Sequence, residues 1–482
     1  MSDGIKRRDF LKVLGVSGAG VAAAGCSTGE VERLIPYVVA PEEIVPGTPT
    51  YYASTCRECP AGCGIIAETH SGRTTKVEGN PANPISLGNL CARGQASVQG
   101  LYHPDRFTGP SAQETGLPPR SLSWSAAEQS LADAIRRARQ AGRPGNVVFL
   151  TQSYTGSMDR LVNQWVAAVG GRRVIYDPFA FQPRGLDFAN AQYLVSFGAD
   201  FLETWGSPVN YAFQLARMRE YRDGRRGKFV WVGPHRPLTG LNADQWVAPR
   251  PGTEAAIALA MAGAMDVATA AQQTGVEAAV IEQLGREFRA GRGFALGPGN
   301  AVQGANAGAL QAAVDRLNGG AAGSAPRGPG MQQVTELVRQ MAAGQVDVLL
   351  IDAPNPVYTL PGALNFAEAM DRVRTTVSFA SFPDDTAVRC DLILPDHHFL
   401  EAWDDYVPTE GVYEIVQPTM RPVFNTKQVG DVLLAVSRQL GLAGVASETT
   451  YYDYIRANFP GGADAWRAAV VRGGVYATPS VP

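Results

Sequence analysis

The chain has 482 residues, a length that corresponds to about three domains. Lysine and arginine number 42 against 45 aspartate and glutamate residues, so the formal net charge is −3. This balance excludes a general nucleic-acid binder, which needs a basic surplus. Hydrophobic residues make up 45% of the chain and charged residues 18%, which excludes a disordered chain and a polytopic membrane protein.

The first 26 residues have the pattern of an export signal. Arg7 and Arg8 form a twin-arginine pair, and an uncharged stretch of 13 residues runs from Val13 to Gly25. A spanning helix needs about 20 apolar residues, so this stretch predicts a signal and not an anchor. Twin-arginine signals export folded proteins, so we expect the protein on the periplasmic side of the membrane. Cys26 is either a lipid-attached cysteine or an incidental thiol beside an ordinary cleavage site.

Residues 27–49 are rich in proline, glutamate and valine, which predicts an extended tether. Beyond them, short β-branched runs alternate with stretches of helical period, the pattern of wound α/β layers around mostly parallel sheets. The predicted strands are Asn146–Leu150, Arg173–Tyr176, Tyr193–Phe197, Lys228–Val232, Asp347–Ile351, Thr375–Phe379 and Asp391–Leu394. The predicted helices include Ser125–Ala138, Ser157–Val169, Ala212–Tyr221 and Thr253–Met265. A Gly/Ala/Pro-rich segment, Gly319–Gly330, predicts a loop between two lobes.

Four cysteines have a spacing that is typical of a metal centre. Cys56, Cys59, Cys63 and Cys91 give the pattern C-x2-C-x3-C-x27-C. The two short intervals let three thiolates converge from one tight loop, and the fourth closes a four-thiolate cage, the ligand set of iron–sulfur clusters and of some zinc sites. The spacing favours a [4Fe-4S] cluster, while a zinc knuckle and disulfides in an oxidising compartment remain alternatives.

Several segments carry a resemblance to a known family. These are Cys56–Cys63, Val77–Pro84, Leu90–Gly94, Leu122–Glu128, Ala191–Leu202, Arg250–Glu254, Asp352–Pro356 and Cys390–Glu401. Together they resemble the molybdopterin oxidoreductases, the superfamily of formate dehydrogenase and polysulfide reductase, over about residues 50 to 440. The resemblance implies a [4Fe-4S] cluster and molybdopterin guanine dinucleotide as cofactors. It also implies that Arg93, two places after the fourth cysteine, lies between cluster and pterin; the alternative is a surface arginine.

The resemblance also implies the domain organisation. The expected fold class is α/β, with a small cysteine-rich N-terminal domain followed by two wound, Rossmann-like lobes. The iron–sulfur domain is expected at residues 50–110, one lobe at 111–150 and 340–482, and the second lobe at 151–339. The family's C-terminal barrel domain is expected to be absent, because the sequence ends at Pro482.

Other residues depart from the pattern of a catalytic member. Residues 177–192 contain no serine or cysteine to ligate molybdenum, and Asp177 and Asp187 are expected to form turns. His397 and His398 are adjacent on an extended backbone, so their side chains point to opposite faces and we expect hydrogen-bonding roles. Cys390 is expected to be a small buried hydrophobe, and residues 403–406 a surface turn.

Within the superfamily the sequence most resembles the molybdopterin-like half of one subunit of alternative complex III, a bacterial quinol oxidoreductase. That resemblance implies a scaffold or electron-transfer subunit without molybdenum, carrying at most one cluster. It implies as partners a ferredoxin-like multi-cluster subunit, a multihaem cytochrome c and a polytopic membrane subunit with the quinol site. The protein is then either lipid-anchored or bound to an inner-membrane complex. The alternative is a truncated catalytic molybdenum or tungsten bis-pterin oxidoreductase acting on a sulfur compound or an oxyanion.

Overall fold

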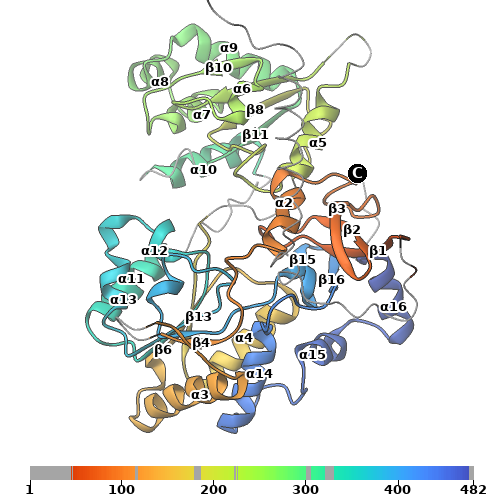
Figure 1. Ribbon diagram of the computed structural model, residues 1–482. Helices are drawn as coiled ribbons and strands as arrows, with labels where there is room; N and C mark the ends of the chain where they lie inside the picture. Colours follow the sequence, from red (N-terminus) through yellow and green to blue (C-terminus); the bar gives the residue numbers. More distant parts are fainter. Residues whose placement is uncertain are drawn as a thin grey trace, which may run out of the picture. The chain divides into compact units, whose positions relative to one another are not determined.

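The computed structural model describes residues 45, 47–113, 118–178, 186–221, 224, 226–299, 306–320 and 331–476 (Figure 1). The predicted export signal, Cys26, nearly all of the predicted tether and residues 321–330 of the predicted loop lie outside them. Among the described residues, no helix combines the length and apolar character that crossing a membrane requires.

The described chain begins with a small antiparallel sheet of three strands, β1 (Thr50–Thr55), β2 (Gly64–His70) and β3 (Arg73–Gly79), in the order β1-β2-β3. Helix α2 (Ala92–Leu101) packs on β3. Alternate residues of β2 are buried, among them Ile65 and Ala67, which have no exposed surface. These strands are missing from the sequence prediction because polar residues on their solvent side interrupt the apolar pattern.

The largest sheet has seven strands in the order β5-β4-β14-β13-β12-β6-β7. The five strands from β14 to β7 are parallel, and β4 and β5 add antiparallel pairs at one edge. The strands are β4 (Ser111–Ala112), β5 (Arg120–Ser121), β6 (Val147–Thr151), β7 (Arg172–Ile175), β12 (Val348–Asp352), β13 (Thr375–Ser378) and β14 (Leu392–Ile393).

Helices cover both faces of this sheet. Val147 and Phe149 of β6 pack against one set of helices, whereas Val148 and Leu150 pack against another, because successive side chains of a strand point to opposite faces. The first set is α3 (Trp124–Gln140), α4 (Gly156–Val169) and α14 (Val429–Leu440), and the second is α11 (Met331–Ala342) and α13 (Phe366–Met370). Burial on both faces explains the uninterrupted apolar runs from which these strands were predicted.

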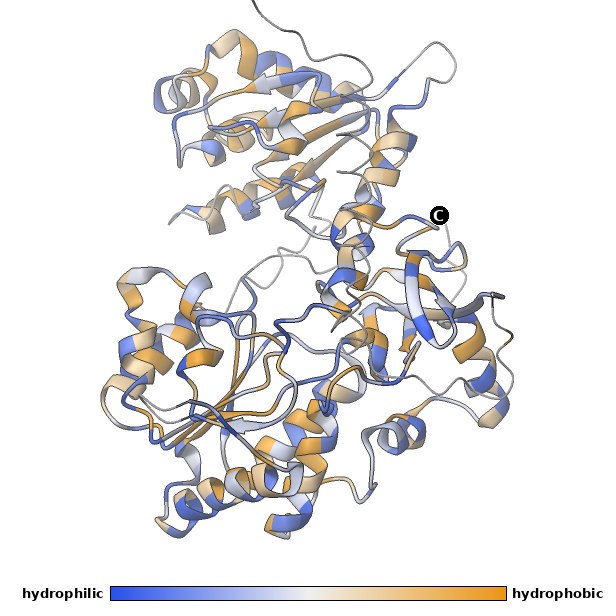
Figure 2. Ribbon diagram, viewed as in Figure 1, coloured by the Kyte–Doolittle hydropathy of each residue, from blue (hydrophilic) through white to orange (hydrophobic). Residues whose placement is uncertain are grey.

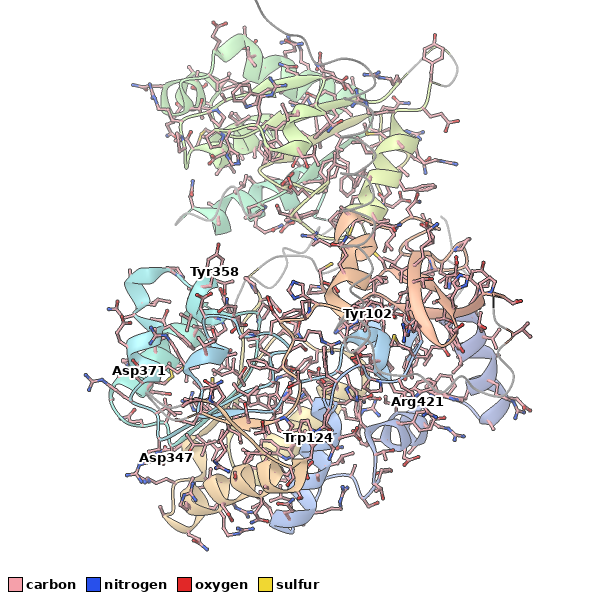
Figure 3. The ribbon with its side chains drawn as sticks, viewed as in Figure 1. Tyr102, Trp124, Asp347, Tyr358, Asp371 and Arg421 are labelled. Carbon is pink, nitrogen blue, oxygen red and sulfur yellow. The ribbon has the colours of Figure 1, made fainter. Side chains whose placement is uncertain are left out.

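Beside this sheet, Tyr358 of α12 (Pro356–Thr359) is 77% exposed (Figure 3).

The second lobe contains a parallel sheet of four strands in the order β10-β9-β8-β11. Its strands are β8 (Tyr193–Phe197), β9 (Lys228–Val232), β10 (Gln245–Val247) and β11 (Gly293–Leu296). Its helices are α5 (Pro208–Met218), α6 (Leu238–Leu241), α7 (Glu254–Met261), α8 (Val267–Thr274), α9 (Ala278–Ala290) and α10 (Ala307–Leu317). Hydrophobic residues follow the strands, and polar residues lie on the outer helix faces (Figure 2).

A second antiparallel sheet lies near the C-terminus and consists of β15 (Asp404–Thr409), β16 (Val412–Val416) and β17 (Gly474–Tyr476). Helices α15 (Tyr451–Asn458) and α16 (Ala463–Arg472) accompany it. The hydroxyl groups of Ser54 and Thr55 at the end of β1 donate to the carbonyl oxygens of Gln417 and Ile415, at 3.1 and 3.2 Å. The hairpin β15–β16 is thereby held against the N-terminal sheet.

The α/β fold class with its N-terminal domain and two wound lobes is confirmed, and none of the four sheets in the described residues closes into a barrel. The expected second lobe began at residue 151. In the structure, however, β7 belongs to the seven-stranded sheet and α4 packs on that sheet, so both lie in the first lobe. The prediction of a surface turn at residues 403–406 is wrong. Most of that segment belongs to β15, where Asp405 is 1% and Tyr406 3% exposed. Asp405 can be buried because it accepts a hydrogen bond from the Ser157 hydroxyl, and Tyr406 is covered by the stacked side chain of Arg57.

Candidate metal centre

Three of the four cysteines lie on the loop that joins β1 to β2. Cys56 directly follows β1 and Cys63 directly precedes β2, and the backbone N–H of Cys56 donates to the carbonyl oxygen of Cys63 at 2.8 Å. Gly62 has a φ of +62°, a conformation that side chains rarely adopt. Cys91 is the residue immediately before α2 and packs in the same apolar cluster as the other three. The tight loop and the helix start therefore place all four cysteines in one apolar cluster.

The four thiols are free and unequally exposed. Cys56 and Cys63 are buried, whereas Cys59 and Cys91 keep part of their surface accessible. Burial raises the pKa of the Cys56, Cys59 and Cys63 thiols, and charge interactions among the cysteines raise these pKa values further. Such thiols stay protonated unless a cation compensates the charge of the thiolates, so a positively charged metal group would stabilise this arrangement.

Four cysteine thiols are the ligand set of iron–sulfur clusters and of some zinc sites. A zinc site needs sulfurs about 2.3 Å from one point, and within the described parts of the chain no three Cys, His, Asp or Glu side chains converge in that way. The four cysteines interact with one another without meeting at one point. A cluster of four irons takes four cysteine thiolates and, when bound, supplies one-electron transfer.

A half-buried arginine, whose Nη1 is buried, lies on the same loop. The guanidinium carbon of Arg57 stands 3.8 Å from the centre of the Tyr406 ring, and the Tyr406 hydroxyl donates to the carbonyl oxygen of Pro60 at 2.5 Å. Burial disfavours the charge of Arg57, but Tyr406 and Asp404 favour it, and the resulting pKa is raised. The sequence analysis gave Arg57 no role; its one signal was a basic residue between the first two cysteines.

Carboxyl groups from distant segments interact electrostatically with Arg57 and with one another. We call Asp352, Asp396, Asp404 and Glu414 the acidic recess. Asp352 ends β12, Asp396 follows β14, and both β15 and β16 contribute one member, so the group forms at the carboxyl edge of the seven-stranded sheet. The three aspartates keep some accessible surface, whereas Glu414 has none.

Burial raises the pKa of every member of the acidic recess. The pKa of Asp404 rises to about 7 and that of Glu414 to about 8, and those of Asp352 and Asp396 also rise. Tyr451 donates its hydroxyl to Asp404 at 2.7 Å. One Glu414 oxygen accepts from the Asn83 amide at 2.5 Å, while Oε2 has no hydrogen-bond partner among the described residues.

Arg93 lies at the surface of this region. It is exposed, its Nη2 donates to the carbonyl oxygen of Glu203 at 3.3 Å, and its charge lowers the pKa of the Cys59 thiol. A cavity of about 410 Å³ borders the fourth cysteine. It is lined by Asn89, Leu90, Cys91, Leu202, Pro208, Val209, Ala212, Phe213 and Ala216. The partly exposed side of the four-cysteine cluster therefore borders an apolar surface beside α5.

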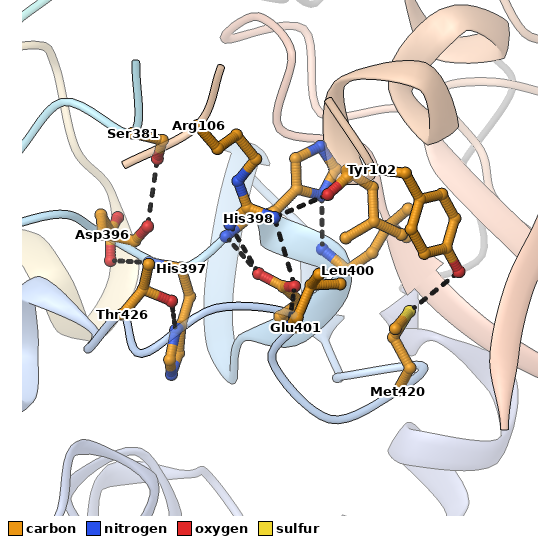
Figure 4. A network of polar contacts seen from close by, with 12 residues as sticks. Tyr102, Arg106, Ser381, Asp396, His397, His398, Leu400, Glu401, Met420 and Thr426 are labelled. Carbon is orange, nitrogen blue, oxygen red and sulfur yellow. Dashed lines mark hydrogen bonds and ion pairs between the residues drawn. The ribbon is translucent and has the colours of Figure 1, made fainter. Parts of the chain in front are cut away.

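The histidine pair has the hydrogen-bonding roles predicted from sequence (Figure 4). His397 Nδ1 lies 2.6 Å from the Thr426 hydroxyl, and His398 Nδ1 accepts from the N–H of Leu400 at 3.3 Å in a capping box with Glu401. Burial lowers the pKa of His397 to about 4.

The other residues weighed from sequence have structural surroundings. Cys390 is 1% exposed within a hydrophobic core, as predicted. Asp177 accepts from the backbone N–H of Ser153 at 3.0 Å, and Asp187 accepts from that of Ala189 at 3.0 Å in a local turn. Both carboxylates are thus engaged by backbone groups.

Comparisons with known proteins agree with this architecture. Residues 49–103 match the molybdopterin oxidoreductase Fe4S4 domain, and residues 120–439 match the molybdopterin oxidoreductase family. The chain is 28% identical to the menaquinone reductase molybdopterin-binding-like subunit of Nitratidesulfovibrio vulgaris, over 92% of this chain and 73% of that protein. It is also 28% identical to the thiosulfate reductase molybdopterin-containing subunit PhsA of Salmonella typhimurium, over 54% of this chain and 35% of that protein.

A solved structure shares the fold. Acetylene hydratase from Pelobacter acetylenicus superposes with a TM-score of 0.67 at 15% identity, covering 81% of this chain and 69% of the hydratase. At that identity the likeness concerns the fold alone. The family match spans well over half of the chain and confirms the resemblance seen in the sequence. The chain belongs to the molybdopterin oxidoreductase family, with that family's Fe4S4 domain at residues 49–103.

Proposed function

We propose that Cys56, Cys59, Cys63 and Cys91 hold one [4Fe-4S] cluster and that the chain is an electron-transfer subunit of a membrane-associated respiratory complex. The grouping of four free thiols on one loop and one helix start carries this proposal. Cys91, beside the apolar cavity, offers the side from which a partner's redox centre approaches the cluster. Partial exposure of a ligand shortens the path for an electron, because the protein layer over the cluster is thinnest there.

The proposal includes the absence of molybdenum. Residues 177–192 supply no serine or cysteine ligand. The relative from Nitratidesulfovibrio vulgaris is named as a molybdopterin-binding-like subunit of a menaquinone reductase, which supports a place in a quinone-linked complex. Likeness to the thiosulfate reductase subunit favours the competing function, a catalytic molybdenum or tungsten enzyme.

Metal analysis of the purified full chain separates these functions. We expect about four iron atoms per chain, with neither molybdenum nor tungsten. Stoichiometric molybdenum or tungsten would favour the catalytic enzyme, and a chain purified without oxygen that holds no iron would overturn the cluster.

The proposed partners follow from the sequence resemblance: a ferredoxin-like multi-cluster subunit, a multihaem cytochrome c and a polytopic membrane subunit. We further propose export by the twin-arginine route and lipid attachment at Cys26. Mass spectrometry of the N-terminal peptide from isolated membranes tests the attachment. A peptide that begins at an acylated Cys26 supports it, and an unmodified Cys26 thiol contradicts it.

A further inference from the structure

Three exposed apolar side chains lie in the second lobe, on α6 and on the edge strand β10 (Figure 1). Leu238 and Leu241 of α6 are 47% and 61% exposed, and Trp246 of β10 is 43% exposed. Trp246 is the most exposed of the seven tryptophans, all of which lie in the described residues. A single exposed apolar residue needs no explanation, whereas a group of them is typical of a contact surface.

The packing around a buried tryptophan brings these side chains together. Trp246 is the register partner of Trp231 in the parallel pair β10–β9, so the two indoles project from the same side of the sheet. Helix α6 covers the same indole, because a Cβ at Gly240 would lie 3.0 Å from Cδ1 of Trp231. Leu238 and Leu241 stand three residues apart on this helix and therefore share one side of it. The three exposed side chains thus lie around one point of the sheet.

Arginine side chains surround this point. The guanidinium carbon of Arg236 lies 5.2 Å from the centre of the Trp246 ring. Arg219 and Arg226 both pair with Asp244, which stands just before β10, at 2.7 and 2.5 Å. The three arginines exceed the one aspartate, so the surface is positive although the whole chain has a net charge of −3. We call the following residues the Trp246 face: Arg219, Arg226, Arg236, Leu238, Leu241 and Trp246.

We propose that the Trp246 face contacts an anionic phospholipid surface and orients the folded protein on the membrane. The inference rests on the membrane-associated location in the proposed function. Arginine attracts the phosphate of lipid headgroups, and tryptophan and leucine side chains are stable at the boundary between headgroups and acyl chains. A lipid on Cys26 would tether the chain without orienting it. A second contact, made by the folded part, determines which side of the protein faces the membrane.

The size of the Trp246 face favours a membrane over a protein partner. A stable protein interface uses about 20–30 residues on each side, many more than this face offers. A shallow membrane contact needs only a few apolar side chains, because the arginines around them add attraction to anionic lipid. The combination of few apolar residues and a basic rim therefore matches the chemistry of a lipid surface.

The experiment measures the flotation of the purified full chain with lipid vesicles, at low and at high salt. Vesicles of phosphatidylglycerol and phosphatidylcholine in equal parts are compared with vesicles of phosphatidylcholine alone. Every chain carries Cys26→Ser, which prevents acylation, so the N-terminal segment contributes equally to all samples. We expect stronger binding to the anionic vesicles and a loss of binding at high salt, because ions screen the arginines.

Two substitutions test the face and two serve as matched controls. Leu241→Ser and Arg236→Gln should each weaken binding to the anionic vesicles about fivefold. Both residues are exposed, so the fold should be unchanged, which circular dichroism checks. Tyr358→Ser and Arg339→Gln remove exposed side chains of the same kinds from the first lobe and should leave the binding unchanged.

The outcomes separate this proposal from its alternatives. Equal binding to anionic and neutral vesicles would overturn it, as would equal losses in the two face variants and the two controls. A photo-reactive group at position 246 that cross-links to protein in cell membranes, together with no vesicle binding, would show a protein interface and also overturn it. Iron content and acylation of the wild type are measured independently of vesicle binding, so the proposed function can fail while the Trp246 face stands, and the reverse.

Discussion

Arg106 and Glu401 form an ion pair from which solvent is excluded. Arg106 Nη2 lies 2.8 Å from Glu401 Oε2, and neither side chain has any exposed surface (Figure 4). Glu401 also accepts from the backbone N–H of Val423 at 2.7 Å, and Arg106 donates to the carbonyl oxygen of Leu101 at 2.7 Å. The pair thus connects the end of α2 with the segment that precedes β15, and so the N-terminal domain with the acidic recess.

The substitution Arg106→Met should strongly destabilise the protein. The change leaves the carboxylate of Glu401 buried without its counter-charge, which costs about 3–5 kcal/mol of the free energy of unfolding. Denaturant unfolding followed by circular dichroism measures the loss. Arg339→Met is the control, because Arg339 and its partner Glu336 are 63% and 46% exposed and such pairs contribute at most about 1 kcal/mol. Equal losses in both variants would contradict the importance of burial.

Gly62→Ala should disrupt the cysteine loop. A Cβ at Gly62 would lie 2.5 Å from Cε1 of Tyr406, and the backbone φ of +62° adds strain for any side chain. We therefore expect less iron per purified chain. Gly142→Ala is the matched control, because Gly142 has a φ of +71° but open space around its Cβ position. Loss of iron in both variants, or in neither, would rule out the contact with Tyr406 as the cause.

Cys59→Ala should remove the broad visible absorbance near roughly 400 nm that four-thiolate iron–sulfur ligation gives. Cys390→Ala changes a cysteine in a different hydrophobic core and should leave the absorbance intact. The spectra are recorded on the two variants purified without oxygen. Unchanged absorbance in Cys59→Ala would exclude Cys59 as a ligand.

His397 should make the protein less stable in acid. Burial lowers its pKa to about 4, below the unfolded value of 6.5, so the unfolded chain takes up a proton that the folded chain does not. The penalty from His397 is therefore absent above pH 6.5. As the pH drops from 6.5 towards 4, this residue lowers the free energy of unfolding by up to about 3 kcal/mol. Because the carboxyl groups of the recess titrate in the same range with the opposite sign, the quantity to measure is the difference between wild type and His397→Gln. The two stability curves should converge as the pH falls from 6.5 to 4, and parallel curves would refute the prediction.

Much of the fold could be predicted from local pattern. The strands at Tyr193–Phe197 and Lys228–Val232 have the predicted bounds, because buried parallel strands are continuous apolar runs. Helix α5 begins four residues before its predicted start at Ala212, since Pro208 is compatible with a first helical turn despite breaking an apolar pattern. The sheets around β1 and β15 were missed, because polar residues interrupt the apolar pattern of their strands and are satisfied by partners from distant segments.

The sequence by itself determined the family, the α/β class and the cysteines of the proposed site, because ligand spacing and hydrophobic period are local properties of the chain. Only the tertiary structure revealed that Arg57 stacks on Tyr406 and that the charges of Asp404 and Glu414 act on it. A charged residue is exposed by default, and burial becomes tolerable only when strands from remote segments pack around it and bring opposite charges and stacking partners. No local pattern records that packing.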